Sequence, residues 1–231
     1  MNLPEPGDHT AGRLGARPVP LTERPWPLPP GLHPLGLPGP RGGLLRVPAA
    51  ATPGPLPLIV MLHGATGDAE RALRRIAPIA EAALLVLPES EGRSWDVIEG
   101  GYGPDLERLD AALAAVFAAW PVDPRRLAIA GFSDGASYAL SLALMNGDLF
   151  THALGFSPGF AAPLGQAGRP RFFLSHGTED QVLPIDRCGR RLAAQLQNAG
   201  YLTIYREFEG GHELPAEIAL TALAFLLAEI A

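Results

Sequence analysis

Leu127–Leu144 reads LAIAGFSDGASYALSLAL, and this stretch decides the fold of the chain. It opens with four apolar residues, the length of a short buried strand, and closes with a run of Ala and Leu that favours a helix. Between them stands Gly131-Phe132-Ser133-Asp134-Gly135, whose two glycines permit a tight turn packed between strand and helix. The stretch therefore predicts a strand, a sharp turn that carries Ser133, and a helix.

Apolar runs of similar length recur along the chain and predict further strands. The full set is Leu44–Val47, Leu56–Leu62, Leu84–Leu87, Leu127–Ala130, Ala153–Phe156, Arg171–Leu174 and Leu202–Phe208. Most of these runs are continuous, which is typical of strands covered on both faces. Helix-length apolar patterns lie between several of them, at 106–120, 185–199 and 216–230. The alternation predicts an α/β fold: a mostly parallel, twisted sheet with helices on both faces. The short stretch between Ser157 and Arg171 leaves no room for a large lid domain.

Prolines are concentrated at the start of the chain, where 15 of the 25 lie in residues 1–57. Because proline fixes φ and lacks a hydrogen-bond donor, residues 1–40 are expected to form an extended, Pro-rich leader with one edge strand around Gly31–Leu37. A polyproline ligand around Trp26–Pro30 is the alternative for this segment. Residues 41–231 are expected to form a single α/β domain.

The composition removes several kinds of chemistry. All 18 residues counted as Lys or Arg are arginines, so the chain has no phosphate-binding Gly-Lys-Ser/Thr loop, Schiff-base lysine or Ser-Lys pair. The single cysteine, Cys188, excludes a disulfide framework and a Cys-rich zinc site. Its place on an apolar helical face predicts a buried, inert thiol. A net charge of −6 argues against a nucleic-acid partner.

The chain shows no sign of a targeting segment or of a membrane span. Its first ten residues carry Glu5 and Asp8, not a basic stretch followed by an apolar one. The long uncharged runs Val47–Gly67 and Leu149–Gly168 are interrupted by Pro and Gly. A cytoplasmic location is therefore the expectation.

The Gly-x-Ser-x-Gly pattern occurs a second time, around Ser157. A nucleophilic serine in such a turn needs a free N–H on the next residue, because that group stabilises a developing oxyanion. Asp134 supplies this N–H after Ser133, whereas Pro158 after Ser157 has none. Ser133 is therefore the candidate nucleophile, and Ser157 is interpreted as part of a turn.

A serine hydroxyl needs a base, and His212 is the candidate. It lies in Gly210-Gly211-His212, after the last predicted strand, where two glycines let the loop reach over the sheet edge. The other five histidines are expected to be solvated or structural; they are His9, His33, His63, His152 and His176.

The base needs a carboxylate, and Asp180 lies in the loop after the run at 171–174. Its place gives the chain order Ser, Asp, His, and Glu179 is its rival. The second oxyanion N–H is expected from Ala65, in the loop that follows Leu56–Leu62.

With these residues, the sequence resembles the α/β-hydrolase fold and, within it, the phospholipase/carboxylesterase family that includes acyl-protein thioesterases. The resemblance spans roughly Leu44 to Ala231. The motifs that carry it are Leu62-His63-Gly64, Ser94-Trp95-Asp96, Gly131-Phe132-Ser133-Asp134-Gly135, His176-Gly177-Thr178-Glu179-Asp180 and Gly210-Gly211-His212. It implies that Asp180 is the acid and that Trp95 helps to line the acyl site. The alternative for Trp95 is a large side chain that covers the sheet edge.

The chain departs from the family at two points. Thr66 adds a residue to the usual His-Gly-x-Gly-Asp loop, so Thr66 replaces Ala65 as donor in one alternative. That loop partly resembles those of polyhydroxyalkanoate-depolymerase-like and feruloyl-esterase-like relatives. The carboxylate of Asp134, near the mouth of the site, is expected to disfavour anionic substrates.

The resemblance and the motifs together predict hydrolysis of a small-molecule ester or thioester through an acyl-enzyme on Ser133. They imply no metal or organic cofactor. The walls of an open site are expected at 92–103 and 160–164, with Trp95, Tyr102, Phe160 and Leu183 as candidate substrate contacts. The alternatives are a small peptidase-like hydrolase, a polyester-depolymerase-like or feruloyl-esterase-like hydrolase, and a non-catalytic binding protein of the same fold.

Overall fold

The computed structural model describes residues 4–19, 27–49 and 54–229. Its centre is an eight-stranded sheet in the order β1-β2-β4-β3-β5-β6-β7-β8. Strand β2 pairs antiparallel with β1 and β4, and all other neighbours pair parallel. The strands are β1 (Gly31–Pro34), β2 (Leu44–Val47), β3 (Leu56–Leu62), β4 (Leu84–Leu87), β5 (Val122–Phe132), β6 (His152–Phe156), β7 (Arg171–Gly177) and β8 (Thr203–Phe208).

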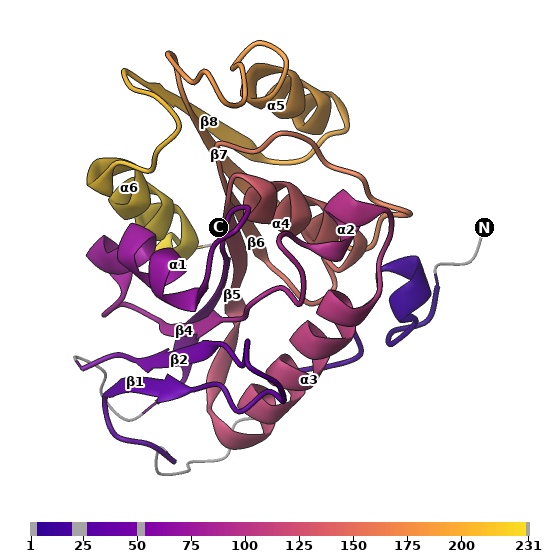
Figure 1. Ribbon diagram of the computed structural model, residues 1–231, viewed down its shortest axis with the longest axis vertical. Helices are drawn as coiled ribbons and strands as arrows, with labels where there is room; N and C mark the ends of the chain where they lie inside the picture. The colour runs from indigo at the N-terminus through magenta and orange to yellow at the C-terminus, as the bar shows by residue number, and fades with distance from the viewer. Residues whose placement is uncertain (1–3, 20–26, 50–53, 230–231) are drawn as a thin grey trace.

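Helices cover both faces of the sheet (Figure 1). One face carries α1 (Ala69–Ile76) and α6 (Ala216–Leu227), with the short 3₁₀ helix η2 (Ala77–Ile79) between α1 and β4. The other face carries α3 (Pro104–Ala119), α4 (Asp134–Met145) and α5 (Gly189–Asn198), and the single turn of α2 (Asp96–Glu99) contacts α4. The α/β fold class predicted from the sequence is confirmed, and the described residues contain no large lid domain.

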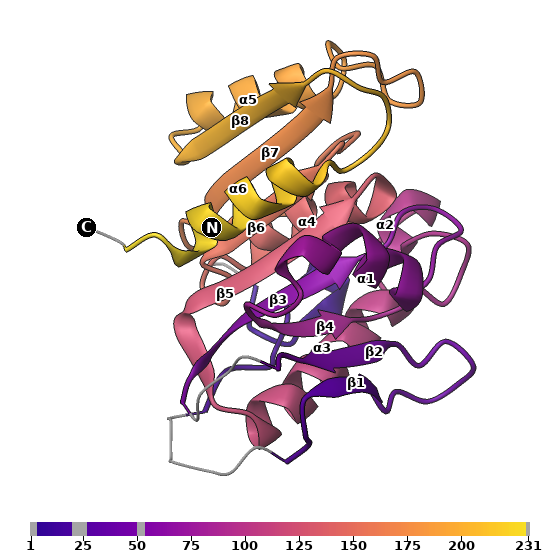
Figure 2. The same cartoon turned by 90° about the vertical axis from the view of Figure 1, so that its left-hand side faces the viewer.

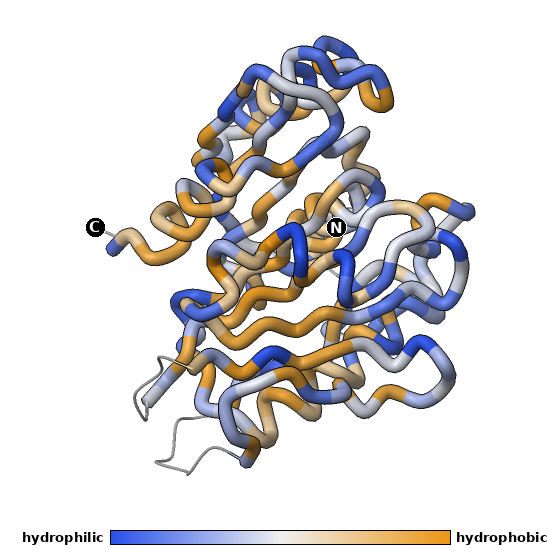
Figure 3. The backbone as a smooth tube through the Cα atoms, turned by 60° about the vertical axis from the view of Figure 1, so that its left-hand side comes forward, coloured by the Kyte–Doolittle hydropathy of each residue, from blue (hydrophilic) through white to orange (hydrophobic). Residues whose placement is uncertain are grey.

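Two hydrophobic cores separate these three layers. In β3, Leu58, Val60 and Leu62 contact the core under α3, α4 and α5, while Ile59 and Met61 contact the core under α1 and α6. Each residue from Leu58 to Leu62 is therefore buried on one side of the sheet or the other, which explains this continuous apolar run. Figure 3 shows the central strands as hydrophobic along most of their length.

Most strands lie where the apolar runs predict them, and the largest differences are at the starts of β5 and α5. Strand β5 begins at Val122, before the predicted Leu127, because Val122 pairs with Leu56 although polar residues follow it. Helix α5 begins at Gly189 instead of Ile185. Residues 185–188 form a turn in which the N–H of Cys188 donates to the carbonyl of Pro184 at 3.1 Å.

The Pro-rich leader contacts the domain in two places. Strand β1 pairs with β2 at the sheet edge, as the sequence analysis expects of this segment. Further upstream, past the 3₁₀ turn η1 (His9–Ala11), Leu14 is fully buried and its N–H donates to the side chain of Asn146 at 2.8 Å. The guanidinium of Arg13 forms an ion pair with Asp148 at 2.8 Å. The alternative polyproline segment begins with Trp26, which lies outside the described residues.

The parallel strands bring distant loops together at one edge of the sheet. Strands β3, β5, β7 and β8 run in the same direction, so the loops that follow them meet beyond their carboxyl ends (Figure 2). In open parallel sheets this edge is the usual place for a ligand site. These loops carry the residues 63–67, Ser133, Asp180 and His212.

Candidate active site

The turn after β5 holds Ser133 in a strained conformation, with φ 56° and ψ −121°. Backbone atoms approach the two flanking glycines closely. A Cβ on Gly131 would lie 2.1 Å from the carbonyl oxygen of Gly135, and a Cβ on Gly135 would lie 2.4 Å from that of Leu62. No side chain fits at either position, so the glycines let β5, α4 and β3 meet directly beneath Ser133.

The structure brings Ser133, His212 and Asp180 into one chain of hydrogen bonds. The Nε2 atom of His212 lies 2.9 Å from the Oγ of Ser133, and its Nδ1 atom lies 2.7 Å from Oδ2 of Asp180. Both distances lie within hydrogen-bond range, so the three side chains form a continuous chain of contacts. Glu179, the rival acid, is exposed to solvent.

Asp180 is held as a carboxylate by several donors. Its Oδ1 accepts hydrogen bonds from the N–H groups of Val182 and Leu183, at 2.9 and 2.8 Å. Burial raises the pKa of Asp180, but the hydrogen bonds from His212, Leu183 and Val182 and the nearby imidazole outweigh it, so the pKa lies below its usual value. The side chain is therefore ionised at neutral pH and fixed in direction.

A second histidine, His176, contacts the same carboxylate, whereas the sequence indicates only a solvated or structural role for it. The Nε2 atom of His176 lies 3.2 Å from Oδ2 of Asp180 and 2.7 Å from the carbonyl oxygen of Leu183. Both neighbours are acceptors, so Nε2 carries the proton. Burial lowers the pKa of His176, which keeps the ring neutral. The sequence signal for this contact is the position of His176, at the end of β7 and four residues before Asp180.

In the loop after β3, the backbone N–H groups of Ala65 and Thr66 differ in their hydrogen-bond partners. The side chain of His63 accepts from the N–H of Ser90 at its Nε2 and donates from Nδ1 to the carbonyl of Gly64 at 2.8 Å. Because the Gly64–Ala65 peptide is trans and planar, the N–H of Ala65 points away from that carbonyl. The N–H of Thr66 donates to the carbonyl of Arg93, whereas within the described residues the N–H of Ala65 has no acceptor.

A pocket of about 270 Å³ opens above the serine. Its lining comes from the loop after β3, helix α1, the turn of Ser133 and the loops that carry Val182 and His212. The residues are His63, Gly64, Ala65, Gly67, Arg71, Ala72, Arg75, Phe132, Ser133, Val182 and His212.

A family model described as "Putative esterase" matches residues 37–188, well over half of the chain. The chain belongs to this esterase family. The matched range includes Ser133 and Asp180, while His212 lies beyond it. The protein is therefore an ester-hydrolysing enzyme, and the expected resemblance to esterases of the α/β-hydrolase fold is confirmed. No curated protein sequence matches the chain.

Solved structures similar to this esterase share its fold. Esterase PE8 is 24% identical over 80% of this chain and 96% of its own, with a TM-score of 0.63. The carboxylesterase of Bacillus cereus is 18% identical over 74% of this chain and 87% of its own, with a TM-score of 0.60. The S-formylglutathione hydrolase FrmB of Staphylococcus aureus is 17% identical over 89% of this chain and 100% of its own, with a TM-score of 0.65.

The Ser94-Trp95-Asp96 motif of the esterase contacts the loop after β3 and the first residue of α4. The Trp95 ring is 1% exposed and lies between His63 and Tyr138, and its Nε1 donates to the carbonyl of His63 at 2.8 Å. The Ser94 hydroxyl donates to the Asp134 carboxylate at 2.6 Å. Since the Trp95 ring is inaccessible, its position matches the alternative role, a large side chain that covers the sheet edge.

The two expected walls of the site contact each other. The hydroxyl of Tyr102 donates to the carbonyl of Ala162 at 2.8 Å, which joins 92–103 to 160–164. Phe160 and Leu183 are half-buried, and none of the four candidate substrate contacts lines the pocket above Ser133.

The second serine motif lies beside the first but differs in chemistry. Ser157 also has a positive φ of 50°, yet it is fully buried and its Oγ has no partner among the described residues. The nearest atom to a Cβ on Gly155 is in a Leu140 side chain at 3.2 Å, so no backbone contact demands glycine there. No helix follows Pro158.

The remaining histidines of the esterase have structural partners. His9 lies 2.8 Å from the carboxylate of Asp110, and His33 lies 2.8 Å from the carbonyl of Pro29. His152 is fully buried against Phe225. The thiol of Cys188 is free and 8% exposed.

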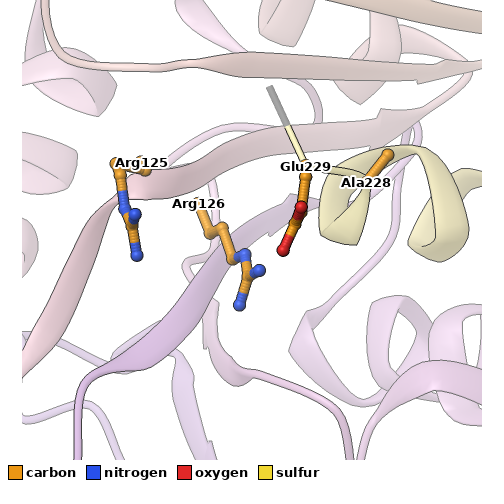
Figure 4. Close-up of a pocket in the computed structure, with 4 residues that line it drawn as sticks. All are labelled: Arg125, Arg126, Ala228 and Glu229. Atoms are coloured by element: carbon orange, nitrogen blue, oxygen red, sulfur yellow. The ribbon is translucent and has the colours of Figure 1, made fainter. Parts of the chain in front are cut away.

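Another pocket, of about 320 Å³, lies near the start of β5, at the opposite end of that strand from Ser133. Arg125, Arg126 and Glu229 extend toward the same side there (Figure 4). Arg125 forms an ion pair with Asp123 at 3.3 Å, so this pocket is not an unbalanced cationic site. Among the described residues, no group of three or more His, Cys, Asp or Glu side chains could hold a metal ion, and no helix is long and apolar enough to cross a membrane.

Proposed function

We propose that this esterase hydrolyses small-molecule carboxylic esters through an acyl-enzyme formed on Ser133. The observation that carries the proposal is the continuous hydrogen-bond chain from Ser133 through His212 to Asp180. Ser133 Oγ attacks the ester carbonyl carbon while His212 Nε2 takes the hydroxyl proton. The tetrahedral intermediate then collapses, the bond to the leaving oxygen breaks, and His212 returns the proton to the departing alcohol.

Water completes the cycle by the same route. It attacks the acyl carbon as His212 takes its proton, and collapse of the second intermediate releases the acid and returns the proton to Ser133. Asp180 orients the imidazole and stabilises its protonated form. A thioester follows the same steps with a thiol as the leaving group.

The N–H groups of Ala65 and Asp134 stabilise the oxyanion in this mechanism. Two observations support Ala65 over Thr66: the N–H of Thr66 is already bonded to Arg93, and the His63–Gly64 bond turns the N–H of Ala65 away from the neighbouring carbonyl. Asp134 is the first residue of α4, where a helix leaves its N–H groups without internal acceptors.

Fluorophosphonate labelling tests the nucleophile. Tryptic mass spectrometry should find the adduct on Ser133, and Ser133→Ala should lower kcat for 4-nitrophenyl butyrate by more than about 10³. Ser157→Ala is the matched control, because Ser157 occupies the same motif without contacting a base, and it should keep its labelling and turnover. An adduct on another residue, or esterase activity that survives Ser133→Ala, contradicts the proposal.

Matched substrates test the bond that is cleaved. We expect 4-nitrophenyl butyrate to be turned over far faster than the corresponding 4-nitroanilide. Rapid turnover of the anilide without esterase activity would instead establish the peptidase alternative.

A further inference from the structure

Two arginines of helix α1 lie in the pocket above Ser133. Arg71 and Arg75 are four residues apart and therefore share one face of α1, and both line the pocket together with Ser133 and His212. Arg74, next to Arg75, is directed elsewhere: its side chain is 64% exposed and pairs with Glu70 at 3.4 Å.

Unlike Arg71 and Arg74, Arg75 pairs with no acidic side chain that the structure describes. Among the residues that the structure describes, no carboxylate lies within 4.0 Å of its guanidinium. The guanidinium carbon lies 3.7 Å from the centre of the Phe132 ring, a cation–π contact that uses the face of the guanidinium and not its edges. Within the described part of the chain, the N–H donors at these edges have no hydrogen-bond acceptor. Burial and the charge of Arg71 both lower the pKa of Arg75. The neighbouring charge that affects Arg75 is therefore positive, like its own.

The acidic groups around the pocket are committed to other partners. Asp68 lies 3.5 Å from the guanidinium of Arg71. Asp134 accepts from Ser94 and does not line the pocket, and Asp180 is buried behind His212. The pocket therefore carries about one uncompensated positive charge, that of Arg75, although the whole chain has a net charge of −6.

A single ring separates this charge from the reacting groups. Phe132 contacts the guanidinium of Arg75 on one side, and its ring centre lies 4.8 Å from that of His212. A group bound by Arg75 is thus a short distance from an ester carbonyl placed at Ser133.

We infer that Arg75, with Arg71 beside it, binds a free carboxylate of the substrate, so that this enzyme prefers esters that carry one negative charge close to the scissile bond. The inference rests on the proposed esterase function of Ser133. A planar guanidinium with free edge donors binds a carboxylate through two parallel hydrogen bonds, and one net positive charge matches a monoanion. It also reverses the expectation that Asp134 disfavours anionic substrates, because Asp134 is bonded to Ser94 and lies outside the pocket lining.

Matched ester pairs test the preference in the native enzyme. The first pair places the charge on the acid side: mono-4-nitrophenyl glutarate against 4-nitrophenyl pentanoate. The second places it on the alcohol side: 3-carboxyphenyl butyrate against 3-carbamoylphenyl butyrate. We expect kcat/KM to favour the anionic member of one pair by about tenfold at low salt, and this advantage to shrink as NaCl is raised. No advantage in either pair would overturn the inference without any variant having to fold.

Variants of α1 identify the residue. Arg75→Gln should lower the ratio of kcat/KM between anionic and neutral esters by about tenfold, and Arg75→Lys should keep part of it because the charge remains. Arg74→Gln is the control on the same helix and should leave the ratio as it is. An unchanged ratio in Arg75→Gln contradicts the assignment. If hydrolysis depends on Ser133 but kcat/KM is the same for anionic and neutral esters, only this inference is overturned. Hydrolysis that does not depend on Ser133 overturns the proposed function.

Discussion

The Oδ2 atom of Asp180 receives two imidazole contacts, from His212 at 2.7 Å and from His176 at 3.2 Å. The contact with His212 belongs to the proposed catalytic hydrogen-bond chain. The contact with His176, a fully buried side chain, fixes the position of the carboxylate. His176 also donates to the carbonyl of Leu183, whose N–H donates to Asp180. The acid is thus set in a small closed network, in which His176 is a positioning residue.

Removing His176 should therefore change how the acid responds to pH. We expect His176→Leu to lower kcat/KM about tenfold and to move the acid limb of the pH–rate profile upward, because the Asp180 carboxylate loses a competing donor and then stabilises the protonated ring of His212 more strongly. His176→Gln retains a donor and should restore much of the rate. A profile with an unmoved acid limb in His176→Leu would show that the contact has no part in setting the acid.

His152 gives a pH prediction for stability. Burial and the charge of Arg171 lower its pKa from 6.5 to about 4. Between these values the unfolded chain binds a proton that the native state does not, so the free energy of unfolding falls as the pH falls. Between pH 6.5 and about 4, the free energy of unfolding of the native protein should fall by on the order of 2–3 kcal/mol more than that of His152→Gln.

Urea unfolding of both proteins between pH 7 and pH 4 measures this difference. Burial raises the pKa of Asp105 to about 6, which acts in the opposite sense, but Asp105 is present in both proteins and cancels from the comparison. Parallel stability curves for the two proteins would contradict the assignment to His152.

At the scale of elements, the meeting of β3, β5 and α4 depends on glycine. We expect Gly135→Ala to destabilise the protein by about 3 kcal/mol or more, because its Cβ would lie 2.4 Å from backbone oxygens of β3 and of the residue after it. Gly159→Ala is the control from the second motif, where the nearest atom is in a Leu183 side chain at 3.4 Å, and it should cost less than about 1 kcal/mol. Equal losses in chemical unfolding would show that the close approach does not govern this turn.

Local pattern sufficed for much of the architecture. Continuous apolar runs located β3 and β4, because every residue of those strands except Pro57 is buried against one core or the other. The first residues of β5 were not predicted, because they are mostly polar. They belong to the strand because Val122 pairs with Leu56, a contact that only the folded sheet shows. Arg75 escaped for a similar reason: in sequence it is one of three arginines on an amphipathic helix, and its lack of a carboxylate partner is a property of the packed site.

For the whole molecule, the leader contributes to the core. Leu14 is fully buried, and its segment is bonded to Asn146 and Asp148 far along the chain. We expect Leu14→Ala to lower the free energy of unfolding by about 2–4 kcal/mol. Leu164→Ala, at a side chain in a residue 64% exposed, should change it by less than about 0.5 kcal/mol. Thermal and urea unfolding measure both, and similar small losses would show that the leader packs loosely in solution.

The strand order of the sheet also has a consequence for how the enzyme loses activity on heating. His212 follows β8, which ends the strand order and, among the strands that the structure describes, pairs with β7 alone, whereas Ser133 follows a central strand. Edge strands fray before central ones, so the base should separate from the nucleophile in partly opened molecules that keep the rest of the fold. Heat should therefore switch off turnover below the temperature at which the protein melts, and cooling should restore it.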